Sequence, residues 1–226
     1  MTSLDGSVIL VIGASGGLGS RIAARLADGG ATVIRSGRSA NSISGAGAYL
    51  ADLRTDRGAA SLVAAAIAQA GRLDGVVIAA GVVAFGPSAE VADATLAELF
   101  ETNAIGPIRA IRAAIPALTE SASAGRDPVI VTITGIVSEA PTAGLAAYSA
   151  SKAALAAFVQ ASTRELRRVG IRLLDARPGH TETGLATRPI AGTAPAFPEG
   201  HTADAVADRI VKAIVDGEKD LPSSAF

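Results

Sequence analysis

Residues 7–19 read Ser-Val-Ile-Leu-Val-Ile-Gly-Ala-Ser-Gly-Gly-Leu-Gly, and this stretch decides the fold. Its unbroken apolar run is typical of a parallel strand covered on both faces, and the glycines that follow predict a tight turn. The next segment, 18–28, carries Leu18, Ile22 and Leu26 on one helical face and ends before a pair of glycines. The stretch therefore predicts a strand, a glycine-rich turn and a helix whose inner face packs on a sheet.

Short apolar runs and longer alanine-rich segments alternate along the rest of the chain. Strand and helix alternate in this way in α/β proteins, where helices cover both faces of a parallel sheet. We therefore expect a doubly wound, Rossmann-type sheet in a three-layer α/β/α arrangement. Strands are predicted at 31–36, 75–79, 128–134 and 171–176 and near 219–222, and helices at 59–69, 93–118, 148–168 and 203–215.

Length and composition fit one folded domain. The chain has 226 residues, of which 49% are hydrophobic and 18% charged, and only 3% are aromatic. A chain of this size buries roughly 70% or more of its unfolded surface, so one sizeable core is available. We expect a single domain over residues 1–226, with a core of Ala, Val, Ile and Leu. The Gly- and Pro-rich stretch at about 184–203 lacks periodicity and is predicted to be a substrate loop.

Charge and cysteine content exclude several classes of function. The formal net charge is -1 and no dense block of Lys or Arg is present, so nucleic acid is not expected as a partner. The absence of cysteine excludes disulfides, a thiolate nucleophile and cysteine-ligated zinc, and no metal is expected. The N-terminus is unlike a secretory signal, and the longest apolar stretch, about 76–85, is far short of the ~20 residues that span a bilayer. We expect a soluble, cytoplasmic protein with no membrane partner.

The glycines of the first turn stand where a phosphate group binds in dinucleotide-binding proteins. They open a helix, whose first N–H groups and dipole favour a phosphate, and glycine lets the phosphate approach the backbone. The same residues match the G-x-S-x-G pattern of hydrolases, with Ser15 as nucleophile and His180 or His201 as base. That elbow normally follows several earlier strands, and a triphosphate-binding loop would need a lysine that is absent here, so dinucleotide binding is favoured. The predicted contacts are Gly13, Ser15, Gly17, Leu18 and Gly19.

The end of the second predicted strand indicates which dinucleotide binds. An Asp or Glu normally stands there and accepts hydrogen bonds from the ribose 2′-hydroxyl of NAD. Here the sequence is Arg35-Ser36-Gly37-Arg38-Ser39, without a carboxylate to repel a 2′-phosphate. Arg38 and Ser39 can donate hydrogen bonds to such a phosphate. The sequence therefore favours NADP(H), with a solvated surface arginine as the alternative.

Tyr148 and Lys152 are four residues apart and so share one face of a predicted helix. A free phenol, with a pKa near ~10, is a poor acid–base catalyst at neutral pH, and lowering that pKa to ~7 requires about 4 kcal/mol. An ammonium ~4 Å away at an effective dielectric constant of ~20 supplies about that much, before desolvation takes part of it back. The pair is therefore a candidate for proton transfer.

In their order and spacing these motifs resemble the short-chain dehydrogenase/reductase family, in its short single-domain branch, over the whole chain. Each motif alone is common, but their combination is specific to that family. Further similar motifs are Asp52-Leu53 at the adenine, Ala80-Gly81 after the fourth strand, Asn103-Ala104-Ile105-Gly106 on the next helix, and Pro178-Gly179 with Thr183 at the nicotinamide.

The resemblance implies a role for each of these residues. Tyr148 would donate a proton to the substrate oxygen, and Lys152 would lower the pKa of Tyr148 and bind the nicotinamide ribose. Asn103 would hold a water in the proton relay, although a hydrogen bond to a neighbouring strand would explain the residue as well. The implied activity is NADP(H)-dependent hydride transfer to or from a small carbonyl or alcohol substrate. The implied assembly is a homodimer or higher homo-oligomer, formed through the helix that carries Tyr148 and the helix after Asn103.

Gly135 departs from the family pattern. The family places a serine there, whose hydroxyl polarises the substrate oxygen, and the loss of one such donor can cost ~10²- to 10³-fold in turnover. Thr134, Ser138 or a backbone N–H at Gly135 could replace it. The alternative function is a cofactor-binding regulatory or scaffold protein of the same fold with impaired catalysis.

Overall fold

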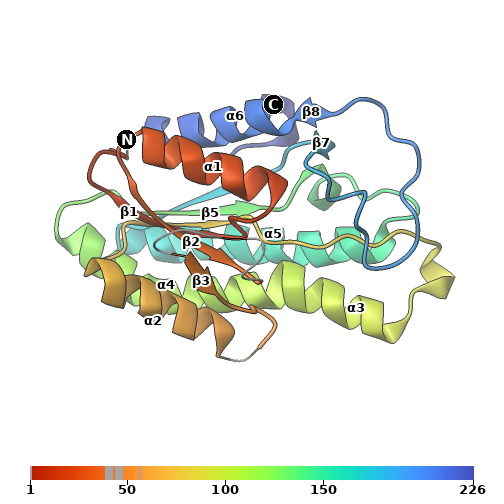
Figure 1. The fold of residues 1–226 in the computed structure, drawn as a ribbon, viewed down its shortest axis with the longest axis horizontal. Helices are drawn as coiled ribbons and strands as arrows, with labels where there is room; N and C mark the ends of the chain where they lie inside the picture. Colours follow the sequence, from red (N-terminus) through yellow and green to blue (C-terminus); the bar gives the residue numbers. More distant parts are fainter. Residues whose placement is uncertain (1, 39–42, 44–47, 56) are drawn as a thin grey trace.

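A six-stranded parallel sheet forms the centre of the molecule (Figure 1). The computed structural model describes residues 2–38, 43, 48–55 and 57–226. The strand order is β3-β2-β1-β4-β5-β6, which confirms the predicted doubly wound, Rossmann-type fold. The strands are β1 Val8–Ile12, β2 Thr32–Gly37, β3 Ala48–Leu50, β4 Gly75–Ile78, β5 Val129–Ile133 and β6 Arg172–Ala176.

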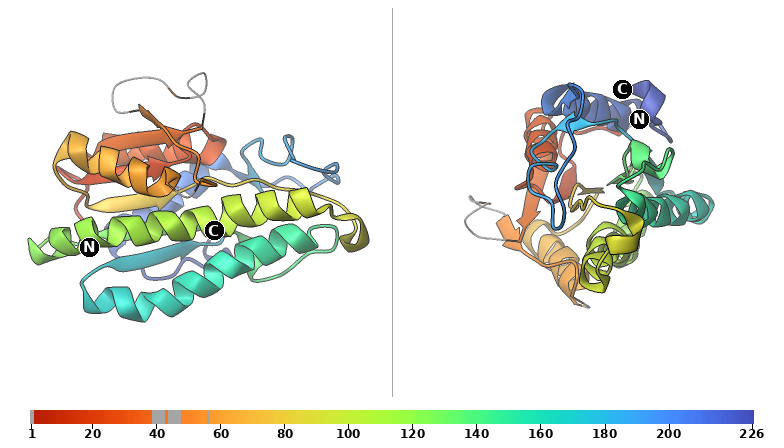
Figure 2. Two further views of the ribbon diagram at one scale, coloured as in Figure 1. Left: turned by 90° about the horizontal axis from the view of Figure 1, so that it is seen from below. Right: turned by 90° about the vertical axis from the view of Figure 1, so that its right-hand side faces the viewer.

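Helices cover both faces of this sheet. Helices α1 and α6 pack together over one face, and the left view of Figure 2 shows α4 lying between α2 and α5 on the other. None of the described helices is long and apolar enough to cross a bilayer. The helices are α1 Gly17–Asp28, α2 Gly58–Ala70, α3 Asp93–Phe100, α4 Gly106–Ser123, α5 Ala146–Arg168 and α6 Ala203–Asp216.

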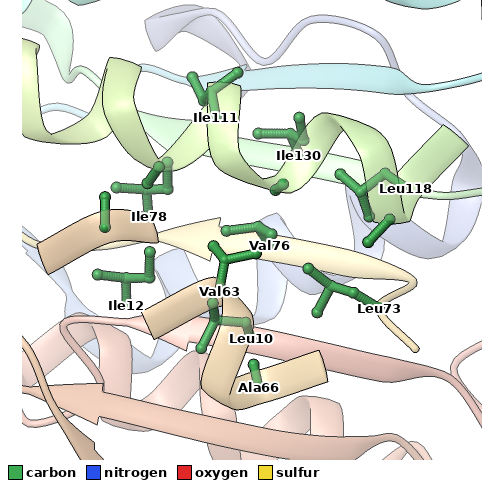
Figure 3. Packing of buried hydrophobic residues seen from close by; sticks show 14 of the residues in the cluster. Leu10, Ile12, Val63, Ala66, Leu73, Val76, Ile78, Ile111, Leu118 and Ile130 are labelled. Atoms are coloured by element: carbon green, nitrogen blue, oxygen red, sulfur yellow. The ribbon is translucent and has the colours of Figure 1, made fainter. Parts of the chain in front are cut away.

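Aliphatic side chains fill the two layers between the sheet and the helices. Leu10 and Ile130 of the sheet pack in one cluster with Ile111 of α4 (Figure 3). A second cluster lies on the opposite face and contains Ile22 of α1 and Ile210 of α6. Every residue of β1 is buried, as expected for a strand at the centre of a sheet with two covered faces.

The strand order places a ligand site at the ends of β1 and β4. The chain runs from β1 outward through β2 to β3 and then returns to β4, on the other side of β1. Because the connections leave β1 and β4 in opposite directions, a crevice forms at the carboxyl ends of these two strands. The glycine turn follows β1 directly and therefore lies at this crevice.

The predicted helix over 93–118 is interrupted in the structure. Helix α3 is followed by a π-helical turn at Glu101–Ile105, and α4 begins only at Gly106. Pro107 has no N–H to donate to the carbonyl of Asn103, four residues earlier. The N–H of Gly106 donates instead to the carbonyl of Glu101, five residues earlier, so the helix widens around Asn103.

Two further differences concern strands. Strand β3 has only three residues and lies outside every predicted strand. The predicted strand near 219–222 is reduced to a single bridge between Leu221 and Ala176. Two short strands pair near the ends of the predicted substrate loop, β7 at Thr181–Glu182 just before it and β8 at His201–Thr202 within its last residues.

Candidate active site

A cavity of about 700 Å³ lies at the carboxyl ends of the strands. Ligand pockets commonly have volumes of about 300–1,000 Å³. The glycine turn, the segments after β2, β4, β5 and β6, and the loop after β7 all contribute to its wall. The predicted site residues that line it are Gly13, Ser15, Gly17, Leu18, Arg38, Asp52, Leu53, Ala80, Gly81, Tyr148, Lys152, Pro178, Gly179 and Thr183.

Three predicted residues are not among those lining the cavity. Gly19 packs behind the glycine turn, against Gly13. Asn103 is completely buried beneath the cavity wall. Ser39 lies outside the described residues.

Close backbone contacts explain three of the glycines in the turn after β1. Gly13 has a φ of +83°, and a Cβ there would lie 2.6 Å from the nitrogen of Ala80. A Cβ on Gly17 would lie 2.5 Å from the carbonyl oxygen of Thr183, and one on Gly19 would lie 2.2 Å from that of Gly13. Helix α1 begins at Gly17, and the first N–H groups of a helix lack intrahelical partners. The turn therefore offers a cradle that fits the diphosphate of a dinucleotide.

Two guanidinium groups and one carboxylate line the cavity next to the end of β2. Arg38 is exposed there, and Asp52 and Arg54 complete this part of the wall. Arg54 donates to the two oxygens of Asp52 at 3.0 and 2.7 Å and to Glu98 at 3.0 Å. The hydrogen bond from Arg54 lowers the pKa of Asp52, and the charge of Arg38 acts in the same direction. The Asp52 carboxylate is thus bound by Arg54.

Tyr148 and Lys152 both line the cavity from α5, as their spacing predicts. The Nζ of Lys152 lies 5.9 Å from the centre of the Tyr148 ring and donates a hydrogen bond to the carbonyl of Ile133. Burial raises the pKa of Tyr148 to about 12 and lowers the pKa of Lys152 to about 8, although Asp175 partly opposes the second effect. The expected lowering of the Tyr148 pKa is therefore not found in this structure, because desolvation of the phenol shifts the pKa upward. The phenol is protonated at neutral pH, as a proton donor must be.

Asn103 fixes the segment after β4 against α5. Its Oδ1 accepts a hydrogen bond from the N–H of Val82 at 2.9 Å, and its Nδ2 donates to the carbonyl of Val82 at 2.9 Å and to Ser151 Oγ at 3.0 Å. Gly81, the residue before Val82, lies next to both side chains, since an added Cβ would be 3.3 Å from Asn103 Oδ1 and 3.4 Å from Lys152 Nζ. Asn103 therefore has a structural role beneath the site, and its role in holding a water stays a prediction.

The substitutes for the missing serine hydroxyl at Gly135 are all engaged elsewhere in the chain. Thr134 donates its hydroxyl proton to the buried Asp175 at 2.6 Å. The hydroxyl of Ser138 donates to the carbonyl of Gly135 at 2.8 Å. The N–H of Gly135 donates to the carbonyl of Ala176 at 3.3 Å. The suggestion that one of these three groups polarises the substrate oxygen is therefore not supported.

Several lining residues were missed in the sequence. Arg54 stands two residues after Asp52, and this pairing of opposite charges was a usable signal. Other missed residues come from loops whose path to the cavity depends on the fold, and they belong to no motif. These residues are Phe85, Thr142 and His180, whereas Phe197, which also lines the cavity, lies in the predicted substrate loop.

The structure does not support the hydrolase interpretation. The Nε2 of His180 lies 3.1 Å from Glu182, and the ring of His201 lies near that of Phe226. Neither imidazole is hydrogen-bonded to Ser15 in the described part of the chain. Over the same ranges, no group of three or more His, Asp or Glu side chains could hold a metal ion.

Comparison with known proteins agrees with this geometry. The family model for short chain dehydrogenase matches residues 7–191. An uncharacterized oxidoreductase of Methylorubrum extorquens is 35% identical over 206 residues, which are 85% of this chain and 81% of that protein. The structure of a 3-ketoacyl-(acyl-carrier-protein) reductase from Brucella melitensis complexed with NADH has a TM-score of 0.87 at 25% identity and covers 97% of each chain. A short chain dehydrogenase from Burkholderia cenocepacia in complex with NADP has a TM-score of 0.82 at 25% identity, covering 99% of this chain and 90% of that one.

The parallel sheet, the glycine turn and the Tyr148–Lys152 pair define a dinucleotide-dependent oxidoreductase. The chain belongs to the short-chain dehydrogenase/reductase family, whose members use NAD or NADP.

Proposed function

We propose that this protein is an NADP(H)-dependent oxidoreductase that transfers hydride between the nicotinamide and a small carbonyl or alcohol substrate. The observation that carries the proposal is that Tyr148, Lys152 and the glycine turn line one cavity of sufficient volume. Proton donor, cation and phosphate cradle are thus arranged around one space, as a reaction that moves a hydride and a proton requires.

The residues of the chain account for binding and for the proton. The bound cofactor supplies the hydride to the substrate carbon in reduction and accepts it in oxidation. The glycine turn would hold the diphosphate, and Pro178, Gly179 and Thr183 would fix the carboxamide of the nicotinamide. Tyr148 gives its phenolic proton to the substrate oxygen as the carbonyl becomes an alcohol, and the reverse reaction returns that proton. Lys152 carries a positive charge below its pKa of about 8 and stabilises the phenolate that remains.

The preference for NADP(H) is supported by the charges near the end of β2. Gly37 leaves no carboxylate at the strand end, and Asp52 is already paired with Arg54. Arg38 lines the same part of the cavity and can donate charge-assisted hydrogen bonds to a 2′-phosphate. Ser39, the second predicted donor, lies outside the described residues.

A cofactor-monitored screen of ketones and aldehydes tests the activity. We expect NADPH oxidation with at least one carbonyl substrate, and we expect Tyr148→Phe to reduce turnover by about 10²- to 10⁴-fold, the usual contribution of a general acid. Tyr49→Phe is the matched control, because Tyr49 is the other tyrosine of the chain and packs against the hydrophobic core on β3. Equal turnover by Tyr148→Phe and the parent would remove Tyr148 from its role.

A second candidate function is a regulatory or scaffold protein that binds the dinucleotide with little turnover. Gly135 favours it, since all three replacement donors considered above are engaged elsewhere. This function predicts that NADPH binds in a fluorescence titration while no carbonyl in the screen is reduced. Turnover that depends on Tyr148 would exclude it.

We also propose that the protein is a homodimer formed through α4 and α5. Alanines at 153, 154, 156 and 157 on α5 are partly or fully exposed and would let two helices approach closely. Light scattering of the purified protein gives the mass directly, and a monomer at micromolar concentration would contradict the proposal.

A further inference from the structure

We infer that the substrate of this site carries an aromatic ring next to its carbonyl group, bound against a cluster of three rings formed by Phe85, His180 and Phe197. The inference rests on the proposed function, because it concerns the substrate end of the same cavity. We call these three residues the ring cluster.

The ring cluster is assembled from separate segments of the chain. Phe85 follows β4, His180 follows β6, and Phe197 lies in the loop between β7 and β8, which extends beyond the sheet in Figure 1. The rings of Phe85 and Phe197 have centroids 6.0 Å apart at an angle of 50°. The rings of His180 and Phe197 are stacked, with centroids 4.6 Å apart at 22°. Both distances are within the range of favourable contacts between aromatic rings.

The cluster belongs to the cavity wall and not to the hydrophobic core. All three side chains line the cavity together with Tyr148, and all three are half-buried. None of them is a member of the buried hydrophobic clusters. The chain has only five Phe and two Tyr, and Phe85, Phe197 and Tyr148 all line this one cavity. This concentration in an otherwise aliphatic protein points to recognition of a flat, apolar group.

Backbone hydrogen bonds attach the middle of the loop to the segment after β4. The N–H of Phe85 donates to the carbonyl of Ala191 at 3.0 Å, and the N–H of Ile190 donates to the carbonyl of Val83 at 2.8 Å. Gly192 lies so close to this segment that an added Cβ would be 1.9 Å from the carbonyl oxygen of Phe85. These contacts do not involve Phe197, which lines the cavity and could stack on a ring of the substrate.

The test compares three methyl ketones, bearing a phenyl, a cyclohexyl or an n-hexyl group, with NADPH as reductant. The phenyl and cyclohexyl ketones have nearly the same size and differ in the planar π-system, and the n-hexyl ketone reports on apolarity alone. The variants are Phe197→Leu and Phe85→Leu, which keep an apolar side chain and remove the ring. Phe158→Leu is the matched control, because Phe158 packs against the core from α5 and does not line the cavity.

The quantity that decides is the ratio of kcat/KM for the phenyl ketone to kcat/KM for the cyclohexyl ketone. Comparing this ratio between parent and variant cancels the intrinsic reactivity of the two ketones. We expect the ratio to fall by about two- to ten-fold in Phe197→Leu, the effect of one aromatic pair. We expect a smaller fall in Phe85→Leu and no change in Phe158→Leu.

The outcomes separate this inference from the proposed function. If Phe197→Leu turns over the ketones with an unchanged phenyl-to-cyclohexyl ratio of kcat/KM, the inference of an aromatic substrate is wrong and the proposed function is unaffected. An equal loss on all three ketones would also overturn the inference, since a merely structural role of Phe197 in the loop predicts that result. No turnover of any carbonyl by the parent protein, despite NADPH binding, would reject the proposed function and the inference with it.

Discussion

The ammonium of Lys152 donates a hydrogen bond to the main-chain carbonyl of Ile133, 2.8 Å away. Lys152 is almost completely buried. Among the hydrogen bonds of the described residues, this uncharged carbonyl is the only acceptor for its ammonium group. The lysine is thus held beside Tyr148 by a weak partner, in a place where its charge is costly. The arrangement favours a cation that is ready to interact with a ligand in the cavity.

We predict that Lys152 makes the free energy of unfolding rise with pH between 7 and 9.5. Burial lowers its pKa to about 8 from a usual value of 10.5, so between these values the unfolded chain binds more protons than the folded one. Below pH 8 the lysine is charged in both states and the full burial cost applies. Between pH 7 and 9.5, the free energy of unfolding of the parent should therefore rise by about 2 kcal/mol relative to that of Lys152→Met.

Urea denaturation of the cofactor-free protein at the two pH values measures this difference. Lys212→Met is the control, because it makes the same substitution at a lysine that is exposed on α6. The interval stays below the pKa of Tyr148, about 12, whose raised value acts in the opposite direction above pH 10. A constant difference between the parent and Lys152→Met from pH 7 to 9.5 would contradict the lowered pKa.

We predict that Asn103→Leu destabilises the protein by about 2–4 kcal/mol, because each buried group left without a partner costs about 1–3 kcal/mol. The N–H and the carbonyl of Val82 would both lose their hydrogen bonds to Asn103. Thr102→Val is the matched control at the adjacent position, since the buried hydroxyl of Thr102 has no hydrogen-bond partner. Removal of this hydroxyl should leave the free energy of unfolding nearly unchanged or increase it. Equal destabilisation by the two substitutions would show that Asn103 does not act through these bonds.

Most of the fold could be predicted from the sequence because each strand candidate is a short, nearly continuous apolar run. The glycine turn then fixes the point where the chain leaves β1. The interruption at Asn103 could not be found from periodicity, since apolar residues continue on both sides of it. This interruption depends on the missing N–H of Pro107, and the effect of a proline on a helix varies with the surroundings of the proline.

The candidate site was predictable where the motifs are local and not where the site is assembled from loops. The Tyr148–Lys152 pair follows from helical spacing alone. The substrate loop that contains Phe197 was predicted from its composition, but its pairing with the segment after β4, through the bridge between Ala84 and Ala191, depends on the fold. The direction of the Tyr148 pKa shift also depends on how far the fold buries the phenol.

We predict that Gly135→Ser increases kcat if the missing hydroxyl limits the reaction. A Cβ at this position would meet only the carbonyl oxygen of Pro178, 3.6 Å away, so the cavity has room for the side chain. The φ of Gly135 is +78°, however, and a residue with a Cβ is strained there by roughly 1–2 kcal/mol. We therefore expect a lower melting temperature together with higher turnover.

Gly135→Ala is the matched control, because alanine brings the same backbone strain without a hydroxyl. The comparison of the two variants with the same ketone and NADPH isolates the contribution of the oxygen. Equal kcat values for the serine and alanine variants would show that no donor is needed at this position.

We predict that Arg38→Ala weakens NADPH binding by about 10- to 100-fold, the loss expected for hydrogen bonds to a charged group, and leaves NADH binding nearly unchanged. Arg38 lines the cavity next to the end of β2, where a 2′-phosphate would lie in the proposed mode of binding. Arg112→Ala removes the same charge from an exposed position on α4 away from the cavity and should affect neither nucleotide. Titrating all three proteins with both nucleotides at one ionic strength gives the two dissociation constants. If Arg38→Ala weakens the binding of both nucleotides equally, Arg38 does not select the 2′-phosphate. If the parent binds NADH more tightly than NADPH, the proposed preference for NADP(H) is wrong.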